Sequence, residues 1–316
     1  MLMVRGGRAQ LRAILGRPTR AAAIAVGNFD GVHRGHQALI ATARSLVGPE
    51  GDVIAYTFDP HPARLFAPRL APPLLLSLDR RAELLGEAGA DIVVVEPFTR
   101  DFAAIQAESF VKHVLANDLE ARHVVVGYDF SFGSGRRGNT DTLVALGAEA
   151  AMGVSIVRRV SVHGITCSST RIREFALEGQ VEGAEVLLGR PLELTGRVVH
   201  GAARGRTIGF PTANVVPDAG ILPKPGIYAA RARLVSAADE TTTWACALSI
   251  GSNPTFTTAG EVTVEAHLLD FSGDLYDQTL RLELVQRLRD EQRFDSVEAL
   301  VAKITDDVAR TRELVT

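Results

Sequence analysis

The pattern of expected secondary structure changes partway along the chain, and this change constrains the fold more than any other feature of the sequence. Through the first half, short apolar runs alternate with segments of helical periodicity, which predicts a parallel sheet with helices on both faces. Residues 92–95 are apolar at consecutive positions, as is typical of strands covered on both sides. Beyond Gly189 the expected strands follow one another with Gly and Pro turns, which favours an antiparallel barrel or sandwich. We therefore predict two domains, residues 1–187 and residues 188–316.

The expected elements follow from these patterns. In the first domain we expect strands at residues 22–26, 53–58, 91–95, 123–127 and 154–158, and helices at 37–47, 79–87, 108–116 and 141–152. A helical stretch at 173–188 precedes strands at 192–199, 226–234, 244–250, 262–270 and 279–288. A last helix is expected at 296–314, with Ser296 as its N-cap.

The first twenty residues carry five arginines and no acidic residue. This composition is found in organellar transit peptides. The alternative is a surface lead-in to the first strand. Gly6, Gly7 and Gly16 favour the lead-in, because glycines interrupt an amphipathic helix.

Composition excludes several classes of protein. Hydrophobic residues make up 46% of the 316 residues and the net charge is −3, so the chain is neither disordered nor a typical basic nucleic-acid binder. Cys167 and Cys246 lie far apart without a CxxC motif, which argues against a disulfide framework and a thiolate zinc site. No apolar run approaches the length needed to span a bilayer. We expect a cytoplasmic protein with no nucleic-acid and no membrane partner.

The densest motif is the decapeptide GNFDGVHRGH at residues 27–36, between the first long strand and its helix. Unpaired N–H groups and a positive dipole at a helix start suit a phosphate. His33 and His36 are three residues apart, so they share one face of the first turn and can donate hydrogen bonds to phosphate oxygens. Two surface histidines at a helix start are the alternative interpretation.

This decapeptide resembles the HxGH signature of the nucleotidyltransferase superfamily. Over its full length it resembles one branch, the prokaryotic bifunctional riboflavin kinase/FMN adenylyltransferases. Further segments resemble that family in order and spacing, so that the resemblance covers nearly the whole chain: TFDPHP at 57–62, GYDFSFG at 127–133 and SSTRIR at 168–173. The resemblance implies a Rossmann-like, doubly wound first domain.

The motifs indicate candidate site residues in the first domain. His33 and His36 are the catalytic candidates. The expected ATP and phosphate ligands are Gly27, Asn28, Phe29, Asp30, Gly31, Gly35, Ser168, Ser169, Thr170 and Arg171. For residues 168–170, plain helix capping is the alternative. The expected flavin contacts are Phe58, Phe66, Asp129, Phe130 and Phe132, although each phenylalanine could equally belong to the core.

In the second domain the decapeptide GRTIGFPTAN at residues 205–214 resembles the signature of riboflavin kinases. The resemblance implies a small Greek-key β-barrel with a C-terminal helix. It also implies that Thr212 and Asn214 bind Mg²⁺ together with ATP phosphates, and hard oxygen ligands of this kind suit Mg²⁺. The expected ATP ligands are Gly205, Arg206, Thr207, Gly209, Phe210, Pro211, Thr212 and Asn214.

A period-two pattern at residues 263–268 places Glu265 on the face opposite Val264 and Ala266. By the resemblance, Glu265 is the base that takes the proton of the ribityl 5′-hydroxyl. A solvated residue on the face of the sheet is the alternative. Asn253, Arg289 and Phe294 are weaker candidates for the flavin pocket.

The resemblance implies two successive reactions. The barrel would convert riboflavin and MgATP to FMN, and the α/β domain would convert FMN and ATP to FAD and pyrophosphate. Mg²⁺ would act with ATP, and flavins would be substrates and products rather than tightly bound redox cofactors. The expected partners are riboflavin, FMN, FAD and ATP, and weak homo-oligomers are left open. An enzyme with only one working module and a non-catalytic flavin sensor are the two alternatives.

Overall fold

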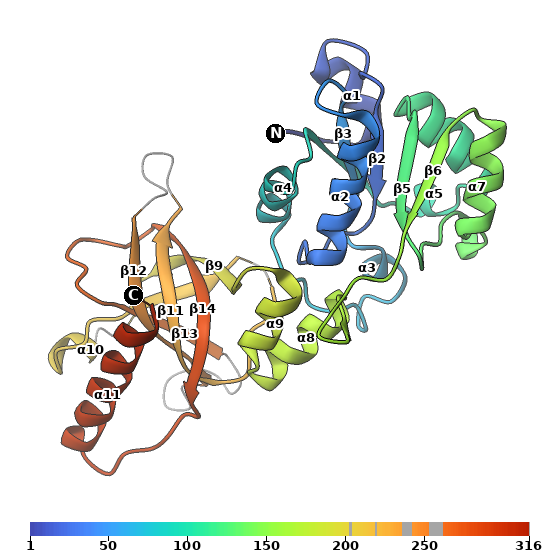
Figure 1. Cartoon of the computed structure of the whole chain (residues 1–316). Coiled ribbons are helices and arrows are strands. Elements are labelled where there is room, and N and C mark those ends of the chain that lie inside the picture. The colour runs from blue at the N-terminus through green and yellow to red at the C-terminus, as the bar shows by residue number, and fades with distance from the viewer. Residues whose placement is uncertain (202–203, 219, 236–241, 253–261, 316) are drawn as a thin grey trace. The chain divides into compact units, whose positions relative to one another are not determined.

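The computed structural model describes residues 1–201, 204–218, 220–235, 242–252 and 262–315. The chain forms two compact units (Figure 1), Met1–Pro73 with Leu78–Ser168, and Leu74–Ser77 with Ser169–Thr316. Packing therefore groups residues 169–187 with the second unit. The predicted boundary, between residues 187 and 188, was placed where the sequence pattern changes from alternating strands and helices to successive strands. No helix within these described ranges is long and apolar enough to cross a bilayer.

The first unit is built on a six-stranded sheet in which every neighbouring pair is parallel. Its strands are β1 (Leu2–Arg5), β2 (Ala23–Val26), β3 (Val53–Asp59), β4 (Ile92–Pro97), β5 (His123–Gly127) and β6 (Gly153–Val157). The order β1-β4-β3-β2-β5-β6 runs outward from β2 in both directions, which confirms the doubly wound fold. The order reverses between β2 and β5, and ligands bind such folds at the carboxyl ends of strands beside this point.

Helices cover both faces of this sheet. One face packs against α2 (Arg34–Val47), which buries Leu39 and Ile40. On the other face a single apolar core joins Ile24 and Ile54 to buried residues of α1 (Arg8–Leu15), the π-helix η1 (Phe110–Asp118) and α7 (Thr140–Glu149). Burial on both sides is the reason that these strands are apolar at consecutive positions.

Shorter elements complete the first unit. They are α3 (Pro62–Phe66), α4 (Leu78–Glu87), α5 (Arg100–Ala103), α6 (Ala107–Ser109), the 3₁₀ turn η2 (Ser134–Arg136) and the hairpin strands β7 (Ser161–Val162) and β8 (Ile165–Thr166). The α-helix expected at residues 108–116 was wrong in type, because the segment leaves α6 and continues as η1.

The lead-in expected at the N-terminus was also wrong. Residues 2–5 form edge strand β1, which pairs in parallel with β4, and α1 follows it directly. Gly6 and Gly7, with φ of 97° and 77°, make the turn before α1, and Gly16 ends it in the left-handed region. The glycines therefore bound the helix rather than interrupt it.

Arg8 links α1 to strand β4 of the sheet by hydrogen bonds to the buried carboxylate of Glu96. Its backbone N–H donates to Glu96 Oε2 at 3.0 Å, its guanidinium pairs with Glu96, and its Nε donates to Asp118 at 2.8 Å. The Tyr56 hydroxyl donates to the same Glu96 oxygen at 2.9 Å. Glu96 is only 7% exposed, so its charge depends on these partners.

We expect Arg8→Ala to lower the free energy of unfolding by about 3–5 kcal/mol, because it leaves the buried Glu96 carboxylate without its cation. Urea unfolding followed by circular dichroism measures the change. Arg100→Ala, which removes an exposed arginine, is the matched control and should change stability by less than about 0.5 kcal/mol. Equal losses in both variants would contradict this role for Arg8.

The second unit is a closed antiparallel barrel, in the order β10-β13-β12-β11-β14-β9, which confirms the predicted barrel. Its strands are β9 (Leu192–Val199), β10 (Ala213–Pro217), β11 (Gly226–Leu234), β12 (Thr243–Ser252), β13 (Val262–Leu268) and β14 (Thr279–Arg289). Strand β10 has no counterpart among the expected elements. Short helix α10 (Arg204–Thr207) lies before it, and the terminal helix α11 (Val297–Val315) packs on β11 and β12. Ser296 caps α11 as predicted, its Oγ accepting from the N–H of Ala299 at 3.2 Å.

The single helix expected at residues 173–188 is two helices, α8 (Ser169–Glu178) and α9 (Val181–Leu188). They separate at Gly179, which has φ of 78°. A Cβ there would lie 2.6 Å from Cδ of Arg287, so both the backbone conformation and the packing require glycine.

Candidate active sites

The loop between β2 and α2 is held in a strained conformation. Phe29 and Val32 have φ of 52° and 40°, and both are buried. Gly31 between them has φ of 84°. A side chain in this region costs about 1–3 kcal/mol, and such strain gathers at functional sites. The loop lies at the carboxyl end of β2, beside the reversal of strand order where a ligand is expected.

His33 and His36 meet at the start of α2, as their spacing predicts. Their rings stack with centroids 3.6 Å apart. His33 is the N-cap of the helix, its Nδ1 accepting from the N–H of His36 at 3.4 Å. A Cβ at Gly35 would lie 3.0 Å from the His33 ring, so this glycine makes room for the histidine. The arrangement presents two imidazoles together at a positive helix end.

Burial keeps His36 neutral. Desolvation, followed by the charges of His33 and Arg81, lowers the pKa of His36 well below its usual value. Its Nδ1 is buried and has no hydrogen-bond partner among the residues that the structure describes. The Phe29 ring meets the imidazole edge-on, with centroids 5.3 Å apart. His36 can therefore offer a neutral imidazole to a ligand.

Arg81 of α4 was not among the predicted site residues, and it is buried, with 2% of its surface exposed. Its guanidinium donates to the carbonyl oxygen of Asn28 at 2.8 Å, and the Thr57 hydroxyl donates to the same oxygen at 3.2 Å. Burial lowers the pKa of Arg81, while the charges of Asp30 and Asp59 oppose that effect. Arg81 lies three and four residues before Leu84 and Leu85, which places it on the buried face of α4. This helical spacing was the feature of the sequence that could have predicted its burial.

The low pKa of His36 predicts a pH effect on stability. The unfolded chain binds a proton at His36 below about pH 6.5 and the folded chain does not, so folding should weaken as pH falls, by at most about 1.4 kcal/mol per pH unit. We expect His36→Asn to flatten the fall in unfolding free energy between about pH 6.5 and 5. His163→Asn, at an exposed turn position, is the control and should leave the slope unchanged. Identical slopes in all three proteins would disprove the effect.

The four phenylalanines proposed for flavin contact belong to one continuous aromatic cluster. Phe58 meets Phe98 and Phe102 with centroids 5.6 Å and 5.8 Å away, and Phe66 meets Phe98 at 6.2 Å. Phe58 and Phe132 are buried in the core, whereas Phe66 is 69% exposed and Phe130 is partly exposed. Phe130 stacks on Phe132, with centroids 5.5 Å apart. Of the four, Phe66 and Phe130 have the surface that a flat ring needs.

The remaining first-domain candidates lie near the ends of β5 and the start of α8. Asp129 is exposed in the turn after β5. Ser168 directly precedes α8, and Ser169, Thr170 and Arg171 form its first turn. Arg171 donates to Glu174 at 2.8 Å and lies over the Phe175 ring. Cys167, the residue just before this motif, accepts a hydrogen bond from the N–H of Gly35. This contact places Cys167 at the start of α2.

The barrel gathers Thr212, Asn214 and Glu265. Strands β10 and β13 pair Asn214 directly with Glu265. The Thr212 hydroxyl donates to Glu265 Oε2 at 3.4 Å. Pairing of these strands therefore unites residues that lie about fifty positions apart in the sequence.

The other members of the 205–214 motif shape the approach to Thr212. Arg206, Thr207, Gly209 and Pro211 are exposed, and Gly209 turns the chain with φ of 87°. A Cβ at Gly205 would lie 2.2 Å from the carbonyl oxygen of Phe210, so the loop closes on itself there. The Phe210 ring meets His267 edge-on, and the ring Nδ1 of that histidine lies 2.7 Å from the carbonyl oxygen of Pro211.

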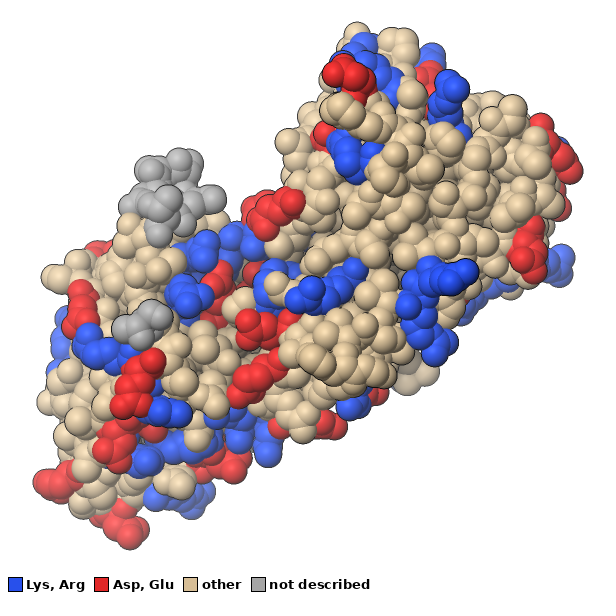
Figure 2. All heavy atoms as spheres, in the orientation of Figure 1, with Lys and Arg blue, Asp and Glu red and all other residues tan. Residues whose placement is uncertain are grey.

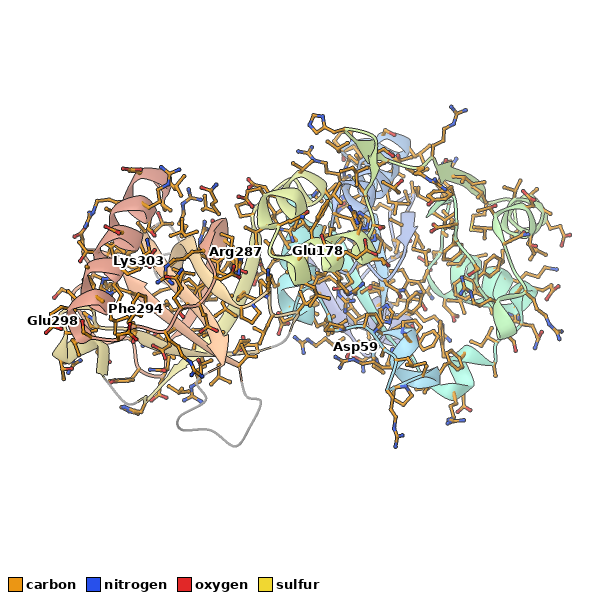
Figure 3. The ribbon with its side chains drawn as sticks, turned by 90° about the horizontal axis from the view of Figure 1, so that it is seen from below. Asp59, Glu178, Arg287, Phe294, Glu298 and Lys303 are labelled. Atoms are coloured by element: carbon orange, nitrogen blue, oxygen red, sulfur yellow. The ribbon has the colours of Figure 1, made fainter. Side chains whose placement is uncertain are left out.

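Arg289 and Phe294 lie between the barrel and its terminal helix. Arg289 donates through Nε and a terminal nitrogen to Asp307 of α11, at 3.0 Å and 2.7 Å. The Arg289 guanidinium lies 5.8 Å from the centre of the Phe294 ring. Figure 3 labels Phe294 in the connection between β14 and α11. Asn253 lies outside the described residues.

Comparisons with known protein families also find two parts in the chain. The profile of the FAD synthetase family matches residues 17–171, and that of the riboflavin kinase family matches residues 188–315. The first match contains the decapeptide at 27–36 and ends within the motif at 168–173, and the second contains the decapeptide at 205–214 and Glu265.

Relatives extend over nearly the whole chain. Bifunctional riboflavin kinase/FMN adenylyltransferases of Pseudomonas fluorescens and Escherichia coli are 39% and 37% identical, over 94% of this chain and 94% and 93% of theirs. A crystal structure titled macrolide-efflux protein, from Streptococcus pneumoniae, is 30% identical, with a TM-score of 0.85 and 99% of both chains covered. The matched domains and the full-length relatives agree, and the chain belongs to the family of bifunctional riboflavin kinase/FMN adenylyltransferases.

Proposed function

We propose that the barrel unit phosphorylates riboflavin with MgATP to give FMN, and that the α/β unit joins FMN to the adenylyl group of ATP to give FAD and pyrophosphate. The juxtaposition of Thr212, Asn214 and Glu265 carries the first assignment. A carboxylate beside two neutral oxygen donors can accept a proton from a hydroxyl while phosphate is held next to it. A non-catalytic flavin sensor would have no use for that carboxylate.

Thr212 and Asn214 would hold Mg²⁺ in the barrel. A hydroxyl and an amide oxygen are hard ligands, and they add no negative charge beside a triphosphate. Mg²⁺ keeps waters and substrate phosphates as its remaining ligands. When bound, Mg²⁺ neutralises charge on the phosphates. Glu265 accepts the proton of the 5′-hydroxyl as that oxygen attacks the γ-phosphate and ADP leaves.

The second reaction belongs to the β2–α2 loop and its histidines. An oxygen of the FMN phosphate attacks the α-phosphate of ATP in line, and pyrophosphate leaves. The protein provides position and charge stabilisation, without a covalent intermediate. His33 and His36 would donate hydrogen bonds to the phosphates in the transition state, while Asn28 and Arg171 hold phosphates.

A product assay tests both assignments. Purified protein is mixed with riboflavin, ATP and Mg²⁺, and the flavins are separated by chromatography over time. We expect FMN to form first and FAD to follow. FMN without FAD would mean that only the barrel is active, and flavin binding without consumption of ATP would favour the sensor.

The proposed partners are riboflavin, FMN, FAD and ATP. Acidic and basic side chains are interspersed on the face that Figure 2 presents, in keeping with the net charge of −3. A cytoplasmic location, the absence of nucleic-acid and membrane partners, and weak homo-oligomers remain predictions from the sequence.

A further inference from the structure

Strand pairing places five residues in one line across the wall of the barrel. Asn214 pairs with Glu265, and Glu265 pairs with Ser249 of β12. Ser249 pairs in turn with Ile227 of β11, and Ile227 pairs with Arg289 of β14. We call this line the transverse row. It joins the proposed metal and base residues at one end to a flavin candidate at the other, a connection that the sequence alone could not reveal.

Ser249 and Glu265 face the same side of the wall. On β12 the neighbours Leu248 and Ile250 are buried inside the barrel, and on β13 Val264 and Ala266 are buried there too. Because side chains alternate along a strand, Ser249 and Glu265 both point outward. Directly opposed residues have Cβ atoms about 4.5–5.5 Å apart. The Ser249 side chain therefore lies beside the carboxylate, on the flank opposite Asn214.

The hydroxyl of Ser249 is available for a ligand. The residue is partly exposed, and within the described ranges its hydroxyl makes no hydrogen bond. A hydroxyl can both donate to and accept from another hydroxyl, which suits a polyol chain. The neighbouring positions Ile227 and Ala247 are apolar, and the carboxylate of Glu291 lies over Gly251, the next outward position of β12. Ser249 is the residue that β12 pairs directly with Glu265.

One strand spacing, about 4.8 Å, separates Glu265 from Ser249. The proposed metal ligand Asn214 lies on the opposite flank of Glu265, on β10. A ribityl chain whose 5′-hydroxyl reacts at Glu265 would therefore continue on the β12 side, where Ser249 is the next position of the row.

We propose that Ser249 binds the ribityl 4′-hydroxyl, the neighbour of the hydroxyl that reacts, and so makes the barrel selective for this polyol. The inference rests on the proposed riboflavin kinase function. Its physical basis is a mutual hydrogen bond beside a partly buried base, where a ligand lacking the 4′-hydroxyl would leave Ser249 unsatisfied.

The test compares riboflavin with 4′-deoxyriboflavin as substrates of the full-length enzyme. We expect the wild type to prefer riboflavin in kcat/KM by about tenfold, the usual effect of one hydrogen bond. Ser249→Ala should raise KM for riboflavin by about tenfold, change kcat little and remove the preference. Ser249→Thr keeps the hydroxyl and should restore part of the preference. A merely structural serine would leave the discrimination unchanged.

Controls separate the possible failures. Thr195→Ala removes an outward hydroxyl on β9, which carries no residue of the transverse row, and should keep the preference. Conversion of supplied FMN to FAD and a thermal unfolding curve show whether each variant is folded. If the wild type forms no FMN, the proposed function fails. If it forms FMN but Ser249→Ala discriminates as strongly as the wild type, the role of Ser249 is overturned and the kinase function stands.

Discussion

Glu265→Gln should suppress formation of FMN from riboflavin by about 10²–10⁴-fold, the usual contribution of a general base. The amide has nearly the same size and can still accept from the Thr212 hydroxyl, but it cannot take the proton of the ribityl 5′-hydroxyl. Conversion of supplied FMN to FAD should remain close to the wild-type rate, because that reaction belongs to the other unit. Chromatography of both product mixtures from one protein preparation measures the two rates together.

The matched control for this experiment is Glu182→Gln, which makes the same chemical change at an exposed position of α9. It should leave both rates unchanged. Loss of both activities in Glu265→Gln, with a normal unfolding curve, would contradict separate sites. Unchanged FMN formation would return Glu265 to the solvated residue that its alternating strand also allowed.

The sequence predicted most of the fold because the pattern of burial in this chain is regular. Strands β5, β9 and β11 begin and end at the expected residues. Strands β9 and β11 each follow a proline, and β5 is a short run of consecutive apolar residues that ends at a glycine. The N-terminal β1 and α1 escaped prediction for a physical reason. Strand β1 has only four residues and exists through its pairing with β4, about ninety positions away in the sequence. No local pattern carries that information.

The candidate sites show the same difference between features set by local sequence and features set by pairing of distant segments. The His33 and His36 pair follows from helical geometry within one turn, so spacing sufficed to predict it. The contact between Thr212 and Glu265 depends on strand register across 53 residues, and only the family resemblance suggested it before the structure. Arg81 and Ser249 lie outside any motif. They become site candidates only through their contacts in the structure, Arg81 with the carbonyl oxygen of Asn28 and Ser249 with its cross-strand partner Glu265.

The second large effect is expected at His33. We expect His33→Asn to reduce conversion of supplied FMN to FAD by about 10²-fold or more, by analogy with removal of an oxyanion-type donor. Asparagine is a good N-cap, so this variant keeps the start of α2 while it removes the imidazole that stacks on His36. FMN formation from riboflavin should be unaffected. The measurement is the steady-state rate of FAD production with saturating FMN and MgATP.

A comparison with His33→Ala separates chemistry from helix capping. Alanine removes both the imidazole and the cap, so it should add a stability loss of about 1 kcal/mol to the loss of FAD formation. If the histidine acts on the phosphates, His33→Asn and His33→Ala should lose FAD formation to a similar extent despite their different stabilities. If His33→Asn instead retains full activity, the imidazole serves only to begin the helix, and the transition state must be stabilised by other groups of the β2–α2 loop.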